Sequence, residues 1–169
     1  GQEGAKDATG KIVEWRYYHG DQKATRYSPL DQINKDNVAD LELAWRFPLN
    51  SFGPRPEYKN ETTPIMVKGV LYFTAGFTRN VVSANAATGE MLWMWRMDEG
   101  VRGEKAPRGN SGRGEAYWTH GRGDERIYTV TPGYHLVALN AKTGLPVPGF
   151  GRNGVVDLMQ GVRGTADPV

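Results

Sequence analysis

The sequence contains no cysteine. Within these residues the chain therefore cannot form a disulfide, a thiolate metal site, a covalent haem attachment or a cysteine nucleophile. The sequence also has no run of about 20 apolar residues, the length that a membrane-spanning helix needs. It does not open with a charged segment followed by an apolar one, which is the pattern of a secretory signal peptide. From the residues alone, a cytosolic protein and an exported protein whose signal has been removed would look the same.

An excess of charge of either sign is missing as well. The chain has 21 lysines and arginines against 19 aspartates and glutamates, and the two signs are interspersed along the sequence. A polyanion partner normally requires a concentrated basic surface, so the sequence predicts no nucleic-acid partner. The three histidines, His19, His120 and His135, are too dispersed to suggest a metal-binding cluster.

The chain does contain a repeated pattern. Residues 82–89 read VSANAATG, and residues 137–144 read VALNAKTG, at a shift of 55 positions. A segment typical of a strand precedes each copy, at residues 71–74 and 127–130. One such unit cannot bury its apolar face alone, so the recurrence predicts a repeat fold.

Short runs of valine, tyrosine and tryptophan, separated by turns that use many of the 22 glycines and 10 prolines, predict an all-β fold. We expect each unit to be a blade of four antiparallel strands. Pro148 takes the place that Trp93 has in the first unit and cannot donate to a ladder, so the last strand of the second unit should be irregular. The expected strands are residues 63–67, 70–74, 81–85 and 91–96, then 114–118, 126–130, 134–140 and a displaced 155–158. Residues 99–112 are polar and rich in glycine and are expected to form a surface loop.

Residues 41–47 alternate apolar and polar side chains with a period of two, which indicates a strand with one buried face. No hairpin partner precedes this strand, so we expect it to pair with strands from far along the sequence and to close a ring of blades. Two units are fewer than a repeat fold needs for a continuous core. The expected organisation is therefore an N-terminal arm with the ring-closing strand (1–47), a first complete blade (48–103) and a second, irregular blade (104–169), with the remaining blades missing from this chain.

Several blocks of the sequence, in order along the chain, resemble the pyrroloquinoline quinone (PQQ)-dependent dehydrogenases. The resemblance runs from about Trp15 to Leu158. The tail at residues 146–158 is more similar to the glucose dehydrogenase branch than to the methanol dehydrogenase branch. The blocks are residues 25–34 (TRYSPLDQIN), 61–65 (ETTPI), 86–93 (AATGEMLW), 113–117 (RGEAY), 136–140 (LVALN) and 149–154 (GFGRNG).

This resemblance implies an eight-bladed β-propeller whose axial funnel holds PQQ above a divalent ion, usually calcium (Ca2+), and which oxidises an alcohol or a sugar hydroxyl. It also implies a periplasmic protein that passes electrons to a cytochrome or a membrane quinone. In this family the metal ligands and the catalytic base lie in later blades, so we expect this chain to hold neither and to be inactive alone. Trp93 matches the tryptophan that docks one blade on the next.

Two cofactor contacts follow from the same resemblance. Glu61 stands where the family has a glutamate that reaches PQQ, and Arg113 stands where an arginine pairs with a PQQ carboxylate. The residue types suit these roles, because a guanidinium forms two charge-assisted hydrogen bonds with a planar carboxylate. Both residues begin equivalent strands of neighbouring units, so we expect both side chains to point toward one axial cavity.

Two alternatives stay open. The chain could belong to a non-catalytic propeller of the same repeat type that acts as a binding or envelope-assembly scaffold, since a fold does not fix a function. The remainder of the propeller could also be a second polypeptide instead of a missing segment. Gly109 stands where the glucose branch often has a histidine, so the substrate is not assigned.

Overall fold

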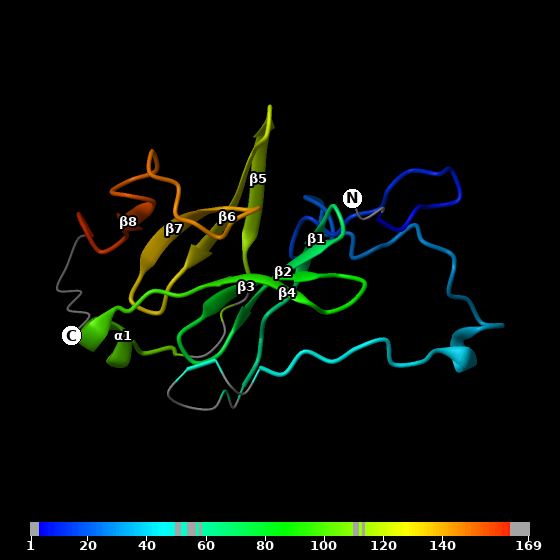
Figure 1. Cartoon of the computed structure of the whole chain (residues 1–169), viewed down its shortest axis with the longest axis horizontal. Helices are drawn as coiled ribbons and strands as arrows, with labels where there is room; N and C mark the ends of the chain where they lie inside the picture. Colours follow the sequence, from blue (N-terminus) through cyan, green and yellow to red (C-terminus); the bar gives the residue numbers. More distant parts are fainter. Residues whose placement is uncertain are drawn as a thin grey trace.

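The computed structural model describes residues 4–49, 52–53, 57, 59–109, 112 and 114–162. Within these residues the strands form two four-stranded antiparallel sheets that follow one another along the chain. Two short helices are also present, the 3-10 helix η1 (Val38–Asp40) and α1 (Gly100–Glu104). Figure 1 shows the sheets side by side, with η1 at the far end of a long excursion of the N-terminal segment. The prediction of an all-β fold built from four-stranded units is confirmed.

The first sheet is a meander of four strands in sequence order. Each strand pairs with the one before it, because the connections are short turns. Lys68 and Gly69 form the first turn and both have positive φ angles, 52° and 75°, the geometry that matches the twist of a two-residue hairpin. The strands are β1 (Ile65–Val67), β2 (Val70–Ala75), β3 (Asn80–Asn85) and β4 (Met91–Trp95).

The second sheet repeats this order but has an irregular last strand. Its strands are β5 (Ala116–Gly121), β6 (Asp124–Val130), β7 (His135–Asn140) and β8 (Val155–Asp157). β8 pairs only with the first part of β7, where Leu136 lies opposite Val156. Pro146 forms an isolated bridge to Leu139 and does not continue into a ladder. The predicted displacement of the fourth strand is thus confirmed.

The two sheets are joined by a layer of apolar side chains. Alternate residues of β1, β2 and β3 point into this layer from the first sheet, and alternate residues of β6 and β7 point into it from the second. Because burial of apolar surface is the dominant favourable term in folding, this layer holds the sheets face to face. Its buried members are Ile65, Val67, Tyr72, Val81, Ile127, Val137, Leu139 and Ala141.

The opposite face of the first sheet is covered by the N-terminal segment. Phe73 and Val82 are buried there, and Phe47 and Phe52 pack against them. The Phe47 ring meets the Phe73 ring edge to face, with their centroids 5.1 Å apart. β2 and β3 are consequently buried on both faces.

Two tryptophans dock on the turn of the next unit in the same way. The Trp93 indole donates to the carbonyl of Ala141 at 3.0 Å, and its ring lies where a side chain at Gly144 would be, 2.5 Å from the Cβ position. The Trp45 indole donates to the carbonyl of Ala86 at 3.2 Å, and its ring occupies the same place over Gly89. The docking role implied for Trp93 is therefore present, and Trp45 holds the equivalent position before the first sheet.

Residues 41–47 do not form a strand. They are extended, but no described residue pairs with them in a ladder. Leu41 and Leu43 are exposed, by 58% and 67%, while Trp45 is held by its docking contact. The expected pairing of this segment with strands from far along the sequence stays a prediction.

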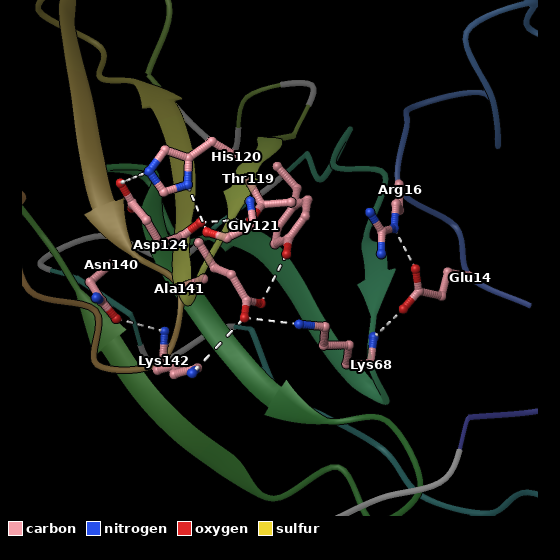
Figure 2. Close-up of polar contacts among 12 residues, drawn as sticks. Glu14, Arg16, Lys68, Thr119, His120, Gly121, Asp124, Asn140, Ala141 and Lys142 are labelled. Carbon is pink, nitrogen blue, oxygen red and sulfur yellow. Dashed lines mark hydrogen bonds and ion pairs between the residues drawn. The ribbon is translucent and has the colours of Figure 1, made fainter. Parts of the chain in front are cut away.

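A carboxylate joins the two sheets at the end where β1 finishes and β6 begins. Glu125 accepts hydrogen bonds from the Lys68 ammonium at 2.8 Å and from the Tyr117 hydroxyl at 2.9 Å. Lys142 lies 3.9 Å from the same carboxylate, and Figure 2 shows Lys68 and Lys142 approaching it from different segments. Although burial opposes ionisation, the hydrogen bonds from Lys68 and Tyr117 lower the pKa of Glu125.

The substitution Gly144→Ala tests the tryptophan docking. Gly144 has a φ of 70°, so an alanine there would carry the left-handed backbone penalty of about 1–2 kcal/mol. Its methyl group would also meet the Trp93 ring, and such overpacking costs about 1–3 kcal/mol. We expect G144A to lower the free energy of unfolding by about 2–5 kcal/mol, measured by urea denaturation.

Gly121→Ala is the matched control. Gly121 has a φ of 80°, but nothing lies within 4 Å of its Cβ position. This variant should carry the backbone penalty alone. Equal losses of stability in G121A and G144A would contradict the docking of Trp93 on Gly144.

Candidate functional site

The segments that lead into β1 and β5 meet at one end of the two sheets. Gly114 has a φ of 119°, and a Cβ added to it would lie 2.9 Å from the carbonyl oxygen of Thr63. Any side chain at position 114 would therefore clash with the main chain that precedes β1. The glycine thus allows the main chain at Gly114 to lie directly against that of Thr63.

A buried threonine on β2 contacts both of these segments. The Thr74 main-chain N–H donates to the Thr62 hydroxyl at 3.2 Å, and the two hydroxyl oxygens lie 3.1 Å apart. The Thr74 hydroxyl also lies 3.4 Å from the carbonyl oxygen of Gly112, to which it donates. Thr74 itself is only 1% exposed.

Glu61 lies at the edge of this end of the first sheet, immediately before Thr62. Its side chain is half exposed, and its carboxylate lies 2.8 Å from the Lys59 ammonium. An ion pair this exposed contributes little to stability. Sequence reasoning missed Lys59, and its only signal was a cation two positions before the candidate acid.

Arg113 lies outside the described residues. Its neighbours on both sides are described, and they are the glycines that contact Thr74 and Thr63. The expectation that Glu61 and Arg113 face one axial cavity therefore stays a prediction.

The connection from β4 to β5 is not the simple surface loop that its composition predicts. It contains α1, and the Glu99 side chain before this helix is only 4% exposed. The Glu99 carboxylate accepts hydrogen bonds from the Gly133 N–H at 2.9 Å and the Thr131 hydroxyl at 2.5 Å, and it lies 2.6 Å from His135 Nδ1. The prediction failed because these partners lie in the turn between β6 and β7, more than 30 positions away.

Two further contacts hold the same connection. Arg102 forms a two-pronged ion pair with Asp157 at 2.7 and 2.9 Å, and hydrogen bonding from Arg102 lowers the pKa of Asp157. Arg79, in the turn between β2 and β3, donates to the carbonyl of Arg108 at 3.0 Å and to that of Val130 at 3.4 Å. Burial lowers the pKa of Arg79. Residues 99–108 are thus held by contacts with both sheets.

A hollow of about 490 Å³ lies beside α1. It is lined by Phe77, Thr78 and residues 96–100, 103 and 104, and Glu61 is not among its lining residues. The hollow is therefore separate from the end of the first sheet that carries Glu61. A planar ligand held there would need further walls from other parts of a complete ring.

Glu115 is a buried carboxyl group without a hydrogen-bond partner among the described residues. It is 9% exposed, and burial raises its pKa to about 8. Burial therefore favours the protonated form of this carboxyl group.

No cluster of histidine, aspartate and glutamate suited to a metal ion occurs within the described parts of the chain. The same residues contain no helix long and apolar enough to span a bilayer.

Comparisons with known proteins give the fold and the family. A family model described as the beta-propeller domain of glucose/ethanol/alcohol dehydrogenase, designated PQQ, matches residues 15–168. The chain is 38% identical over 143 residues to the dehydrogenase subunit of the quinone alcohol dehydrogenase of Gluconobacter oxydans, covering 83% of this chain and 17% of that protein. It is 34% identical over 171 residues to the glycerol dehydrogenase large subunit of Gluconobacter thailandicus, covering 95% and 22%.

Among solved structures, the quinohemoprotein alcohol dehydrogenase of Comamonas testosteroni matches with a TM-score of 0.66 and 31% identity, over 90% of this chain and 20% of that one. The two sheets are therefore blades of a β-propeller, as the resemblance implied. The chain belongs to the family of PQQ-dependent dehydrogenases. It spans about a fifth of the length of the curated relatives it matches.

The described residues fit a PQQ ligand by their chemistry. PQQ is a flat quinone with three carboxylates, so it calls for cations and for hydrogen-bonding groups along one edge. The Glu61 carboxylate, which is half exposed, and the Lys59 ammonium, which is 71% exposed, lie together before β1.

The raised pKa of Glu115 predicts a pH-dependent stability. The unfolded chain loses this proton near pH 4.5, whereas the folded chain keeps it until about pH 8. Because the folded state binds the extra proton between these two pH values, the free energy of unfolding falls as the pH rises from 4.5 toward 8. The contribution of the protonated Glu115 is complete only below pH 4.5. Relative to E115Q, which cannot titrate, the parent should lose on the order of 3–5 kcal/mol of unfolding free energy across this interval.

Urea denaturation at a series of pH values measures this difference. Glu90→Gln is the control, because Glu90 is an exposed acid in a turn. The pH profile of E90Q should run parallel to that of the parent. A parallel profile for E115Q as well would show that Glu115 ionises normally in the folded protein.

Proposed function

We propose that this chain is the N-terminal part of a PQQ-dependent dehydrogenase that oxidises an alcohol or a sugar hydroxyl. The observation that carries the proposal is the direct contact between two blade entrances. Gly114 packs on the main chain of Thr63, and Thr74 bonds to both segments. These contacts bring Thr62 and Thr63 next to Gly112 and Gly114, which are the sequence neighbours of Glu61 and Arg113.

The two residues have complementary roles in this proposal. Glu61 hydrogen-bonds a polar edge of the cofactor from the first blade. Arg113 pairs with a cofactor carboxylate through its planar guanidinium, a geometry in which two parallel charge-assisted hydrogen bonds form. Together they orient the flat ring system and keep it from rotating in its own plane.

The bound quinone supplies an acceptor for the hydride that leaves the alcohol carbon, with assistance from a divalent metal ion, usually calcium. We propose that the ligands of this ion and the catalytic base lie outside this chain. The residues of this chain contribute one wall of the site and no proton-transfer group. The chain on its own is then expected to be inactive.

The rest of the ring is proposed to come from residues outside this chain, either a missing segment or a second polypeptide. Trp45, which docks on Gly89 as Trp93 docks on Gly144, supports the role of residues 41–47 as the ring-closing strand. On this interpretation residues 48–103 are the first complete blade, and residues 104–169 are a second blade with an irregular fourth strand. The protein is proposed to be periplasmic and to pass its electrons to a cytochrome or to a quinone in the membrane.

PQQ binding by the intact protein that contains these residues tests the proposal. The protein without PQQ is titrated with PQQ in the presence of calcium. The absorption of the bound quinone gives the Kd for PQQ. We expect E61Q and R113K each to raise Kd by about 10- to 100-fold, since hydrogen bonds to charged groups are worth about 1.5–3 kcal/mol.

Glu90→Gln and Arg122→Lys are the matched controls, because both residues lie in turns at the opposite end of the blades. Both controls should bind PQQ as the parent does and should oxidise a primary alcohol with an artificial dye at the parent's rate. A parent protein that binds no PQQ would contradict the proposal and would favour a non-catalytic scaffold.

A further inference from the structure

Thr74 occupies an unusual place between the two blade entrances. It is a polar residue on β2 and is 1% exposed. It lies two positions after Tyr72 on the strand, so both side chains point into the apolar layer between the sheets. Buried hydroxyl groups are found bonded because an unpaired one is costly. The partners of Thr74 are the residue next to Glu61 and the carbonyl of Gly112.

The hydrogen atoms available define one consistent arrangement. Thr74 N–H donates to the Thr62 hydroxyl, which leaves the hydrogen of that hydroxyl free to point at Thr74 Oγ1. The hydrogen of the Thr74 hydroxyl then points at the Gly112 carbonyl. Each hydroxyl has a single hydrogen, and each of these hydrogens is used in one hydrogen bond of the series. Both segments are therefore fixed by one side chain.

The surroundings keep this chain of hydrogen bonds from shifting. Gly114 touches the Thr63 main chain, so the segment from the second blade cannot move closer to the first. The Arg79 side chain lies under Gly112, with its Cδ 3.3 Å from the Cβ position of that glycine, and its guanidinium holds Arg108. Arg79 therefore contacts both Arg108 and Gly112.

We propose that Thr74 is a positioning residue for the cofactor site, which sets where Glu61 stands relative to the entrance of the second blade. This inference rests on the proposed function, since it concerns how the Glu61 contact with PQQ is held. Thr74 does not touch the cofactor. It acts through Thr62, the covalent neighbour of Glu61.

The substitution Thr74→Val tests the inference in the intact protein. Valine keeps the shape and the burial of threonine but removes the hydroxyl, so it releases Gly112 and removes one bond of Thr62. We expect T74V to raise the Kd for PQQ about five- to tenfold, the loss that one to two hydrogen bonds account for. T74S retains the hydroxyl and should restore the parent's Kd.

Thr129→Val is the matched control. Thr129 is also a buried threonine, on β6, but its hydroxyl has no hydrogen-bond partner among the described residues. T129V should bind PQQ as tightly as the parent. If T129V weakened PQQ binding as much as T74V does, the effect would come from general loosening of the blades, and the positioning role would be wrong.

A double-mutant cycle separates positioning from stability. If Thr74 acts through Glu61, then T74V should add nothing to the Kd of E61Q, because the contact it positions is already lost. Additive effects of T74V and E61Q would overturn the inference. If the parent binds PQQ and T74V binds it with the same Kd, the positioning role of Thr74 is wrong, while the proposed function stands. A parent that fails to bind PQQ overturns the proposed function itself.

Discussion

The face-to-face packing of the two sheets is the interaction on which the rest of the structure depends. Val81 of the first sheet and Val137 and Leu139 of the second are fully buried in this layer. Neither sheet could bury these side chains alone, because each presents an apolar face to the other. Trp93 of the first sheet docks on Gly144 of the second, and Lys68 bonds Glu125 at one end.

This packing also explains why the segments before β1 and β5 meet at the other end. β1 and β5 are equivalent strands of successive blades, so stacking the blades brings their entrances together. Close approach of the two main chains requires a glycine, and Gly114 supplies it. The hydrogen bonds from Thr74 to Thr62 and to Gly112 then hold the two main chains next to each other. The apolar layer supplies the stability, while these few polar contacts fix how the two segments lie relative to each other.

Much of the fold could be predicted from local patterns. The repeated Thr-Gly turns mark the two units, and Pro148 correctly indicates that the last strand of the second unit is displaced to β8. These features are local because a turn or a proline acts on its own neighbours. The alternation at residues 41–47 also indicates an extended segment, but pairing depends on residues outside it.

The contacts of the candidate site could not be predicted in the same way. Glu99 looks like a solvated acid in a polar loop, and only the fold brings it to His135. Thr74 reads as an ordinary strand residue, and its partners lie 12 and 38 positions away. Glu61 was predicted as a cofactor contact only through the family resemblance, since the composition of the sequence alone favours a solvated surface acid at that position.

A structure of the intact protein with PQQ and calcium bound is the most direct test of the central claim, that two adjoining blade entrances form one wall of the cofactor site. The account predicts a Glu61 carboxylate oxygen at about 3 Å from a polar atom of the quinone, with Thr62 still bonded to Thr74. PQQ bound far from residues 61–63 and 112–115, or Glu61 turned to the outer surface, would contradict it.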